Sequence, residues 1–136
     1  MVRHYTVTLG PYSRGFHLIT DDVLLAVVSW PRQGMLTVYM KHTSAGLCIN
    51  ENADADVRHD FQLYFDRLAP EDLPGIRHQM EGPDDMPAHI KSVLSGAVVT
   101  IPVVDGRPAL GTWQGIFLCE FRNRATPRTL IISVIE

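Results

Sequence analysis

The chain has 136 residues, of which 46% are hydrophobic and 20% are charged, and this composition favours one folded domain with a buried core. The formal net charge is −3, and no basic tail or stripe indicates a nucleic-acid-binding protein. No apolar run approaches the roughly 18 residues of a membrane span, and the start of the chain, MVRHYTVTLG, lacks the apolar region of a signal peptide. We therefore expect a single domain over residues 1–136, in the cytoplasm, with neither nucleic acid nor a membrane as a partner.

Runs of β-branched and aromatic residues between turn residues predict seven strands. In chain order they are HYTVTLG, FHLIT, GMLTVYMKH, AGLCIN, AVVTIPVV, IFLCEF and RTLIISVIE. Three helices are predicted between them, beginning at Thr20, near Asp54 and near Met86, with Thr20 able to cap the first. Many strands with three helical segments indicate an α+β fold with a mostly antiparallel sheet.

The second predicted helix carries an apolar stripe at helical spacing, which is Val57, Phe61, Tyr64, Phe65 and Leu68. We interpret this stripe as core and not as a cofactor contact. Pro70 ends the helix, and a long proline-containing loop follows it. Loops of this length in small domains are often functional.

The two cysteines, Cys48 and Cys119, each lie in an apolar, strand-like segment and not in a CxxC motif. We interpret both as small buried hydrophobic residues. A reactive thiol at Cys48 is the alternative, because this residue lies within a segment rich in polar residues.

That polar segment is HTSAGLCINENADAD, His42–Asp56, directly after an apolar strand. Side chains two residues apart share one face of a strand, so His42 continues the apolar row of Leu36, Val38 and Met40. A histidine where a dry core meets solvent suits a metal ligand or a general base. A histidine hydrogen-bonded at a strand end is the alternative, and this observation alone favours it.

Glu120 lies in GIFLCEFR, a run that is apolar at both strand parities. A strand of this kind is usually buried, and a buried glutamate is rare unless it is paired or metal-bound. Glu120 is therefore either solvated near the strand end or paired inside with a cation, a histidine or an arginine. Both alternatives stay open.

The segment RHQMEGPDDMPAHIK adds a second group of polar candidates, which are His78, Glu81, Asp84, Asp85, His89 and Lys91. His78 and His89 would complete a three-histidine set with His42, as in open catalytic zinc sites. The spacing lacks the HExxH pattern, and a solvated acidic loop is the alternative. A third group, GTWQG at 111–115, places Trp113 to stack on a flat ring and Gln114 to orient it, the alternative being an indole packed at a strand corner.

Three of these segments, HTSAGLCINENADADVRHDF, EGPDDMPAHIKS and LGTWQGIFLCEFR, resemble the YjbQ family, also called UPF0047. Members of that family are often labelled secondary thiamine-phosphate synthase. The resemblance runs from about Arg14 to the C-terminus. It implies an α+β fold with a sheet curled toward a barrel, and a homotrimer. Relatives often have SAALTINE where this chain has SAGLCINE, so the resemblance implies no nucleophilic role for Cys48.

The resemblance also implies a polar cluster drawn from the three motifs. Its members here are His42, Thr43, Ser44, Asn50, Glu51, His78, Glu81, Asp84, His89, Thr112, Trp113, Gln114 and Glu120. Among them we expect His42, His78 and His89 to bind a divalent metal, either zinc or magnesium. We expect catalytic roles for His42, Glu120 and Glu51. Substrate contacts are expected from Thr43, Ser44, Asn50, Lys91, Thr112, Trp113 and Gln114.

Three functions follow as hypotheses. The first is a thiamine-phosphate synthase-like transferase, which joins a pyrimidine diphosphate to a thiazole phosphate with a cation neutralising the leaving diphosphate. The second is a metal-dependent hydrolase with Glu120 or Glu51 as general base. The third is a non-catalytic trimer that binds a small anion. The expected partner is a small phosphorylated metabolite, and for the hydrolase the substrate is left open.

Overall fold

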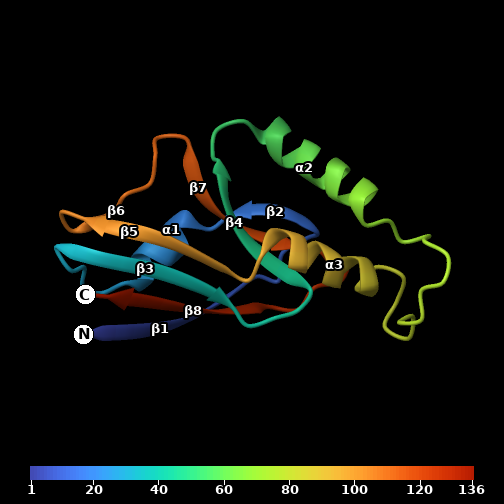
Figure 1. The fold of residues 1–136 in the computed structure, drawn as a ribbon, viewed down its shortest axis with the longest axis horizontal. Helices are drawn as coiled ribbons and strands as arrows, with labels where there is room; N and C mark the ends of the chain where they lie inside the picture. The colour runs from blue at the N-terminus through green and yellow to red at the C-terminus, as the bar shows by residue number, and fades with distance from the viewer.

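Two antiparallel sheets and three helices make up the computed structural model, which describes residues 1–136 (Figure 1). The strands are β1 Val2–Leu9, β2 Gly15–Leu18, β3 Gln33–Met40, β4 Ala45–Glu51, β5 Val98–Val104, β6 Arg107–Pro108, β7 Gln114–Glu120 and β8 Arg128–Ile135. The helices are α1 Thr20–Ala26, α2 Ala55–Leu68 and α3 Asp85–Ser95. One sheet has the order β1-β8-β3-β5-β6 and the other the order β2-β7-β4. The predicted α+β class with a curled antiparallel sheet is confirmed.

The main core lies between the two sheets, because strands of both sheets turn alternate apolar residues toward each other. Leu36 and Val38 of β3 meet Leu47 of β4 and Leu118 of β7 there, and all four are fully buried. Burial of each such side chain stabilises the fold by roughly 1.5 to 3 kcal/mol. This core ties the small sheet to the large one.

A second, smaller core lies on the other face of the small sheet. Phe16 of β2 and Phe117 and Cys119 of β7 pack there with Ala88 of α3, and Phe61 of α2 packs against them. Strand β7 is therefore buried on both faces, as its apolar sequence predicts. The consequence is that Glu120, at the end of β7, is fully buried.

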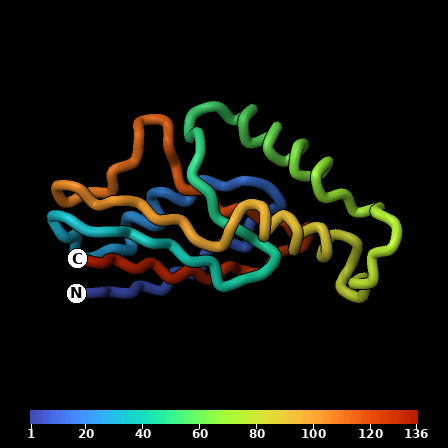
Figure 2. Tube along the Cα trace, viewed as in Figure 1, coloured from blue at the N-terminus to red at the C-terminus, as the bar shows by residue number.

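Helix α2 covers this second core only in part (Figures 1 and 2). Phe61 and Phe65 of its predicted stripe pack inward. Tyr64 and Leu68 are 70% and 65% exposed, so the prediction that the whole stripe is core was wrong for these two. Helix α2 therefore packs on the small sheet through Phe61 and Phe65, whose rings both contact Phe16 of β2.

The start of α1 differs from the prediction in one detail. Ile19 and not Thr20 is the N-cap residue, and no side chain caps this helix. The Thr20 hydroxyl instead accepts a hydrogen bond of 2.9 Å from the Ile116 backbone N–H. Thr20 thus joins α1 to β7, a contact between residues far apart in the sequence.

The long loop 69–84 connects α2 to α3 at one end of the molecule, which lies at the right in Figure 2. It leads directly into the first turn of α3. The last turn of α2, the loop and the first turn of α3 therefore lie at the same end of the molecule. None of the three helices has the length and apolar character needed to cross a membrane.

Candidate functional site

Three potential metal ligands converge where loop 69–84 meets α3. The ligand atoms of His78, Asp85 and His89 all lie within 4.8 Å of one another. Asp85 Oδ2 lies 2.6 Å from His78 Nε2 and 3.0 Å from His89 Nε2. Asp85 and His89 share one face of α3 because they are four residues apart in a helix, and the loop returns His78 to that face. The predicted pairing of His78 with His89 is therefore present in the structure.

Neighbouring groups outside the cluster hold its potential ligands in place. His89 Nδ1 lies 2.8 Å from the Thr43 carbonyl oxygen. A carbonyl only accepts hydrogen bonds, so Nδ1 carries the proton and donates it, and Nε2 is the atom presented to Asp85. Metal-binding histidines commonly have this kind of partner on the other ring nitrogen.

Arg122 holds the carboxylates from the opposite side. It donates to Asp85 Oδ1 through Nη1, to Asp84 Oδ2 at 2.9 Å through Nε and to the Glu81 carbonyl at 2.8 Å through Nη2. Asp85 is only 1% exposed. Burial by itself raises the pKa of Asp85, but hydrogen bonding from His78 and the Arg122 charge outweigh it and hold that pKa below its usual value. Asp85 is thus a buried, ionised carboxylate that points at two imidazoles.

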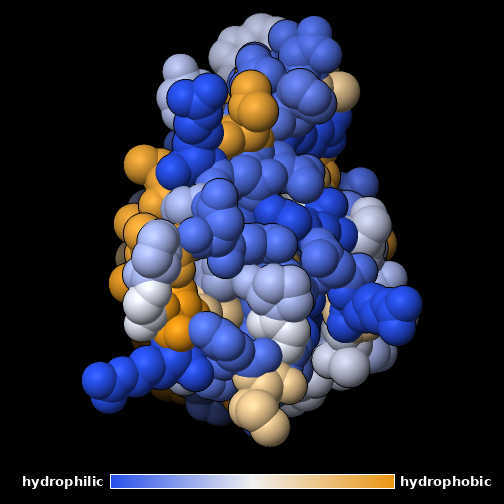
Figure 3. All heavy atoms as spheres, turned by 90° about the vertical axis from the view of Figure 1, so that its right-hand side faces the viewer, coloured by the Kyte–Doolittle hydropathy of each residue, from blue (hydrophilic) through white to orange (hydrophobic).

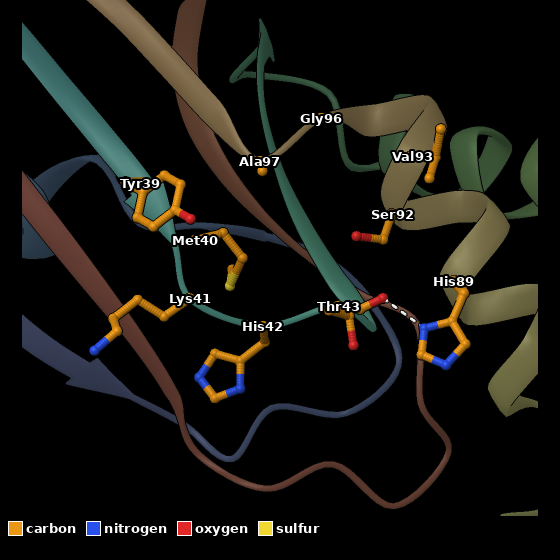
Figure 4. Close-up of a pocket in the computed structure, with 10 residues that line it drawn as sticks. All are labelled: Tyr39, Met40, Lys41, His42, Thr43, His89, Ser92, Val93, Gly96 and Ala97. Atoms are coloured by element: carbon orange, nitrogen blue, oxygen red, sulfur yellow. Dashed lines mark hydrogen bonds between the residues drawn. The ribbon is translucent and has the colours of Figure 1, made fainter.

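A cavity of about 440 Å³ adjoins His89. Its lining comes from the end of β3, the following loop and the last turns of α3, and includes Lys41, His42, Thr43 and Ser92 (Figure 4). No aspartate or glutamate lines it. The donors available in this cavity therefore favour an anionic ligand.

His42 lies in this cavity on the far side of Thr43 from His89 (Figure 4). Its Nε2 accepts a hydrogen bond of 2.8 Å from the Thr129 backbone N–H. Burial and the Arg128 charge lower the pKa of His42, so the ring is neutral with its proton on Nδ1. The structure places Asp85 in one cluster with His78 and His89, and it places His42 outside that cluster.

Glu120 is paired inside the protein with an arginine. Arg128 Nε lies 2.7 Å from Oε1 and Arg128 Nη2 lies 2.6 Å from Oε2. Oε2 also accepts from the backbone N–H groups of Phe121 and Arg122. Arg128 continues to the Ser44 hydroxyl at 3.0 Å. With both oxygens bonded, Glu120 fixes Arg128 and Ser44 in place beside the cavity.

The other predicted site residues lie at the opposite end of the small sheet. The register pairs Ala45 with Glu120 at one end of β4 and Glu51 with Gln114 at the other, and six steps along a strand span about 20 Å. Glu51 accepts from the Asp54 N–H, Asn50 from the Glu51 N–H and Gln114 from the Gly111 N–H. The carbonyl of Thr112 accepts from Asn52, and the Trp113 side chain is 66% exposed.

Lys91 is also placed away from the cavity. It is 2% exposed and its Nζ donates to Asp66 of α2 at 2.6 Å, so it joins α3 to α2.

The sequence did not single out Arg122 and Arg128 as site residues. The signal available for Asp85 was its spacing of four from His89 at the start of a predicted helix.

Comparison with known proteins shows the family and the fold. The family described as UPF0047 protein YjbQ-like matches residues 5–136. The chain belongs to this family. It is 46% identical over 131 residues to the UPF0047 protein YjbQ of Escherichia coli O157:H7, which covers 95% of this chain and 94% of the relative. It is 52% identical over 103 residues to a UPF0047 protein of Synechocystis, covering 76% and 70%.

Solved structures of YjbQ-like proteins share the fold. A YjbQ/UPF0047 protein from Clostridium acetobutylicum is 33% identical, with a TM-score of 0.78 over 98% of this chain and 99% of that one. A conserved hypothetical protein from Thermus thermophilus is 32% identical, with a TM-score of 0.82 over 93% and 96%. A YjbQ-like protein from Sulfolobus solfataricus, at 20% identity and a TM-score of 0.85, shows the fold alone.

Proposed function

We propose that this YjbQ-family protein is a metal-dependent enzyme acting on a small phosphorylated metabolite, with a divalent transition-metal ion held by His78, Asp85 and His89. The observation that carries the proposal is the convergence of two imidazole nitrogens and one carboxylate oxygen within 4.8 Å. Two histidines and a carboxylate form a common ligand set for zinc and for non-haem iron, and three protein ligands leave a position open for water or substrate.

The cavity beside His89 supports an anionic substrate. Lys41 contributes an exposed ammonium group, His42 an N–H and Thr43 a hydroxyl, while no carboxylate competes with the ligand. The end of the molecule that carries loop 69–84 and the start of α3 is hydrophilic over most of its surface (Figure 3). A phosphoryl group in the cavity would meet donors there and contact His89, the one proposed metal ligand that also lines the cavity.

The protein groups then have defined tasks. A bound divalent ion would lower the pKa of its water toward about 7 and polarise a phosphoryl oxygen. The Thr43 carbonyl orients His89, Arg122 orients Asp85, and neutral His42 offers Nδ1–H as a donor at the cavity. These contacts favour hydrolysis of a phosphate ester as the reaction.

A thiamine-phosphate synthase-like transferase is the second candidate, favoured by the same acid-free cavity, which could receive a leaving diphosphate. Trp113 and Gln114, the residues expected to hold the pyrimidine, lie about 20 Å away along β4, and Lys91 is engaged with Asp66. The transferase would therefore have to bind its substrates without these three residues. Formation of thiamine phosphate from both substrates with Mg²⁺, above an H89A control, would favour it over the hydrolase.

The experiment that tests the metal site is a calorimetric titration of chelator-treated protein with Zn²⁺ and Co²⁺. Wild type should bind one equivalent, and H78A, D85N and H89A should each lose binding. H42A is the matched control and should retain it, because His42 lies outside the cluster. Equal loss in H42A, or no binding by wild type, would contradict the proposed ligand set.

Activity is tested separately with phosphate monoesters such as p-nitrophenyl phosphate. Turnover should depend on added Zn²⁺ or Co²⁺ and disappear in H89A, while H42A should raise KM because it removes a donor from the cavity. Metal binding without any turnover of phosphate esters would support the ion site and contradict the proposal that the protein is a phosphate-ester hydrolase.

We also propose that the protein forms a homotrimer. Apolar side chains stay exposed on strands of the large sheet that no helix covers, among them Met35, Tyr39, Val98 and Val104, and association would remove them from water. Light scattering during size-exclusion chromatography should give three times the chain mass of 15.2 kDa. A monomer mass at micromolar concentration would contradict this.

A further inference from the structure

The two cysteines lie in contact although 71 positions separate them in the sequence. Cys48 Sγ on β4 lies 3.6 Å from Cys119 Sγ on β7. Both thiols are free. Cys119 is fully buried, whereas Cys48 is half-buried and lines a cavity of about 200 Å³. The interpretation of both as small buried hydrophobic residues fits Cys119, but it misses the contact between the thiols and the access that Cys48 has to this cavity.

The strand register makes a disulfide between them unfavourable. Cys48 is paired with Phe117, and Cys119 is paired with Gly46, so the two cysteines are diagonal neighbours. Diagonal neighbours in an antiparallel pair have Cα atoms about 7 to 8 Å apart, whereas disulfides usually span Cα separations below about 6.8 Å. Closing the bond would require β4 and β7 to shift within a core that is packed on both faces.

The same separation suits a single atom bound by both sulfurs. For bonds of about 2.3 Å, the zinc–sulfur length, two sulfurs 3.6 Å apart subtend roughly 100° at the bound atom. That angle matches a pyramidal or tetrahedral centre. A linear two-coordinate centre would need sulfurs about 4.6 Å apart at the same bond length.

The residues around the two sulfurs indicate which pyramidal or tetrahedral atom could bind there. The site offers two sulfurs and no third ligand, because the only cluster of histidine, cysteine and carboxylate ligands in the structure is that of His78, Asp85 and His89. A zinc ion would need two more protein ligands. A trivalent arsenic atom that already carries one organic group needs only two thiolates to complete its pyramid.

The cavity beside Cys48 suits the organic group of such a compound. Phe16, Phe61 and Phe65 line it together with Leu94. Phe61 and Phe65 belong to α2, no residue of which is buried, so this wall of the cavity is the lightly packed one. An aryl group could therefore stack among the phenylalanines while its arsenic atom meets Cys48 at the cavity wall and Cys119 behind it, 3.6 Å away.

We infer that Cys48 and Cys119 form a dithiol site for monosubstituted trivalent arsenicals, with the apolar substituent held in the cavity of Phe16, Phe61 and Phe65. For an arsenical R–As=O, two As–S bonds form, the As=O bond breaks, and both thiol protons leave with the oxygen as one water. No oxidation state changes. Hydrogen bonding between the thiols lowers the pKa of Cys48 and raises that of Cys119, which supports Cys48 as the sulfur that reacts first.

The test uses phenylarsine oxide at one equivalent on the folded protein, followed by intact mass spectrometry. Wild type should gain one phenylarsenic group with loss of one water. The adduct should resist excess glutathione and be removed by 2,3-dimercaptopropanol. Glutathione offers one thiol per molecule, whereas a dithiol can bind arsenic through two sulfurs, as the protein does. C48S and C119A should each weaken retention by about 10² to 10⁴, the usual gain from a second linked contact.

Folding of the variants is checked independently of arsenic. C119A should keep the wild-type circular dichroism spectrum, and N-ethylmaleimide should label its Cys48, so that loss of the adduct reflects the missing sulfur. Equal retention of the arsenical by C119A and wild type would show capture by one thiol and overturn the inference. Failure of wild type to take up the arsenical, while N-ethylmaleimide labels Cys48, would also overturn it.

Discussion

The two ends of strand β4 carry similar polar residues but use them differently. At the Glu51 end, two side chains bond to nearby backbone, Glu51 to the Asp54 N–H and Gln114 to the Gly111 N–H, each three residues away. Only Asn52 reaches a distant segment there, and it does so through backbone carbonyls. At the Ala45 end, the partners are distant in sequence, as in Arg128 with Ser44, 84 residues apart. Local bonds shape a turn, whereas distant ones hold several elements around one cavity.

The largest expected effect comes from breaking the ion pair at the Ala45 end. R128M would leave Glu120 buried and without its cation, and removing one partner of a buried pair costs about 3 to 5 kcal/mol. Urea unfolding at pH 7.5 should show a lower midpoint with an unchanged slope.

The control for this prediction is the double variant E120Q/R128M, which removes both charges and keeps an acceptor for the Phe121 and Arg122 N–H groups. It should recover most of the lost stability, because the penalty arises from the single unpaired charge and not from the loss of the pair. If the double variant is as unstable as R128M, packing of the Arg128 side chain and not the ion pair would account for the loss.

A second effect should appear in metal affinity. R122M would leave the three ligands of the cluster in place but remove the group that donates to Asp85 Oδ1. Loss of such an outer partner typically weakens metal binding by 10- to 100-fold. Calorimetry with Zn²⁺ should show this loss, and unchanged affinity would mean that α3 alone positions Asp85.

Much of the fold follows from the sequence, because strand alternation and helix spacing are local patterns. Strand parity placed His42 at the end of a buried row. The doubly apolar strand gave a buried, paired Glu120 as one of two alternatives, and the structure has that one. The site was predicted less well, because the three motifs were taken to converge. Motifs at opposite ends of a strand are close in sequence and about 20 Å apart in space. The register in which β4 pairs with β7 places these motifs at opposite ends of the strands. The sequence of either segment alone does not determine that register.

At the other end of β4, a smaller change in stability is expected without any effect on the metal. Asp54 caps α2 by accepting from the Asp56 N–H at 2.8 Å. D54A should cost about 1 kcal/mol, and D54N should cost little because asparagine caps equally well. Zn²⁺ affinity should equal that of wild type in both variants. A changed affinity would show that the two ends of β4 are coupled.

The smallest effect is a pH dependence at the Ala45 end. Burial and the Arg128 charge lower the pKa of His42 in the folded protein, against a smaller opposing effect of Glu120. In the unfolded chain the pKa is about 6.5. Below that pH the unfolded state therefore binds more protons, so His42 destabilises the fold as the pH falls from 7.5 to 5.5.

H42Q isolates this contribution, because the glutamine amide oxygen can accept from the Thr129 N–H in place of Nε2 and does not titrate. Urea unfolding of both proteins at pH 7.5 and pH 5.5 should show H42Q gaining stability relative to wild type at the lower pH, by less than about 1 kcal/mol. Groups common to both proteins cancel in that difference. An equal difference at the two pH values would mean that His42 is protonated as easily in the fold as outside it. The neutral donor that the cavity requires would then be absent at mildly acidic pH.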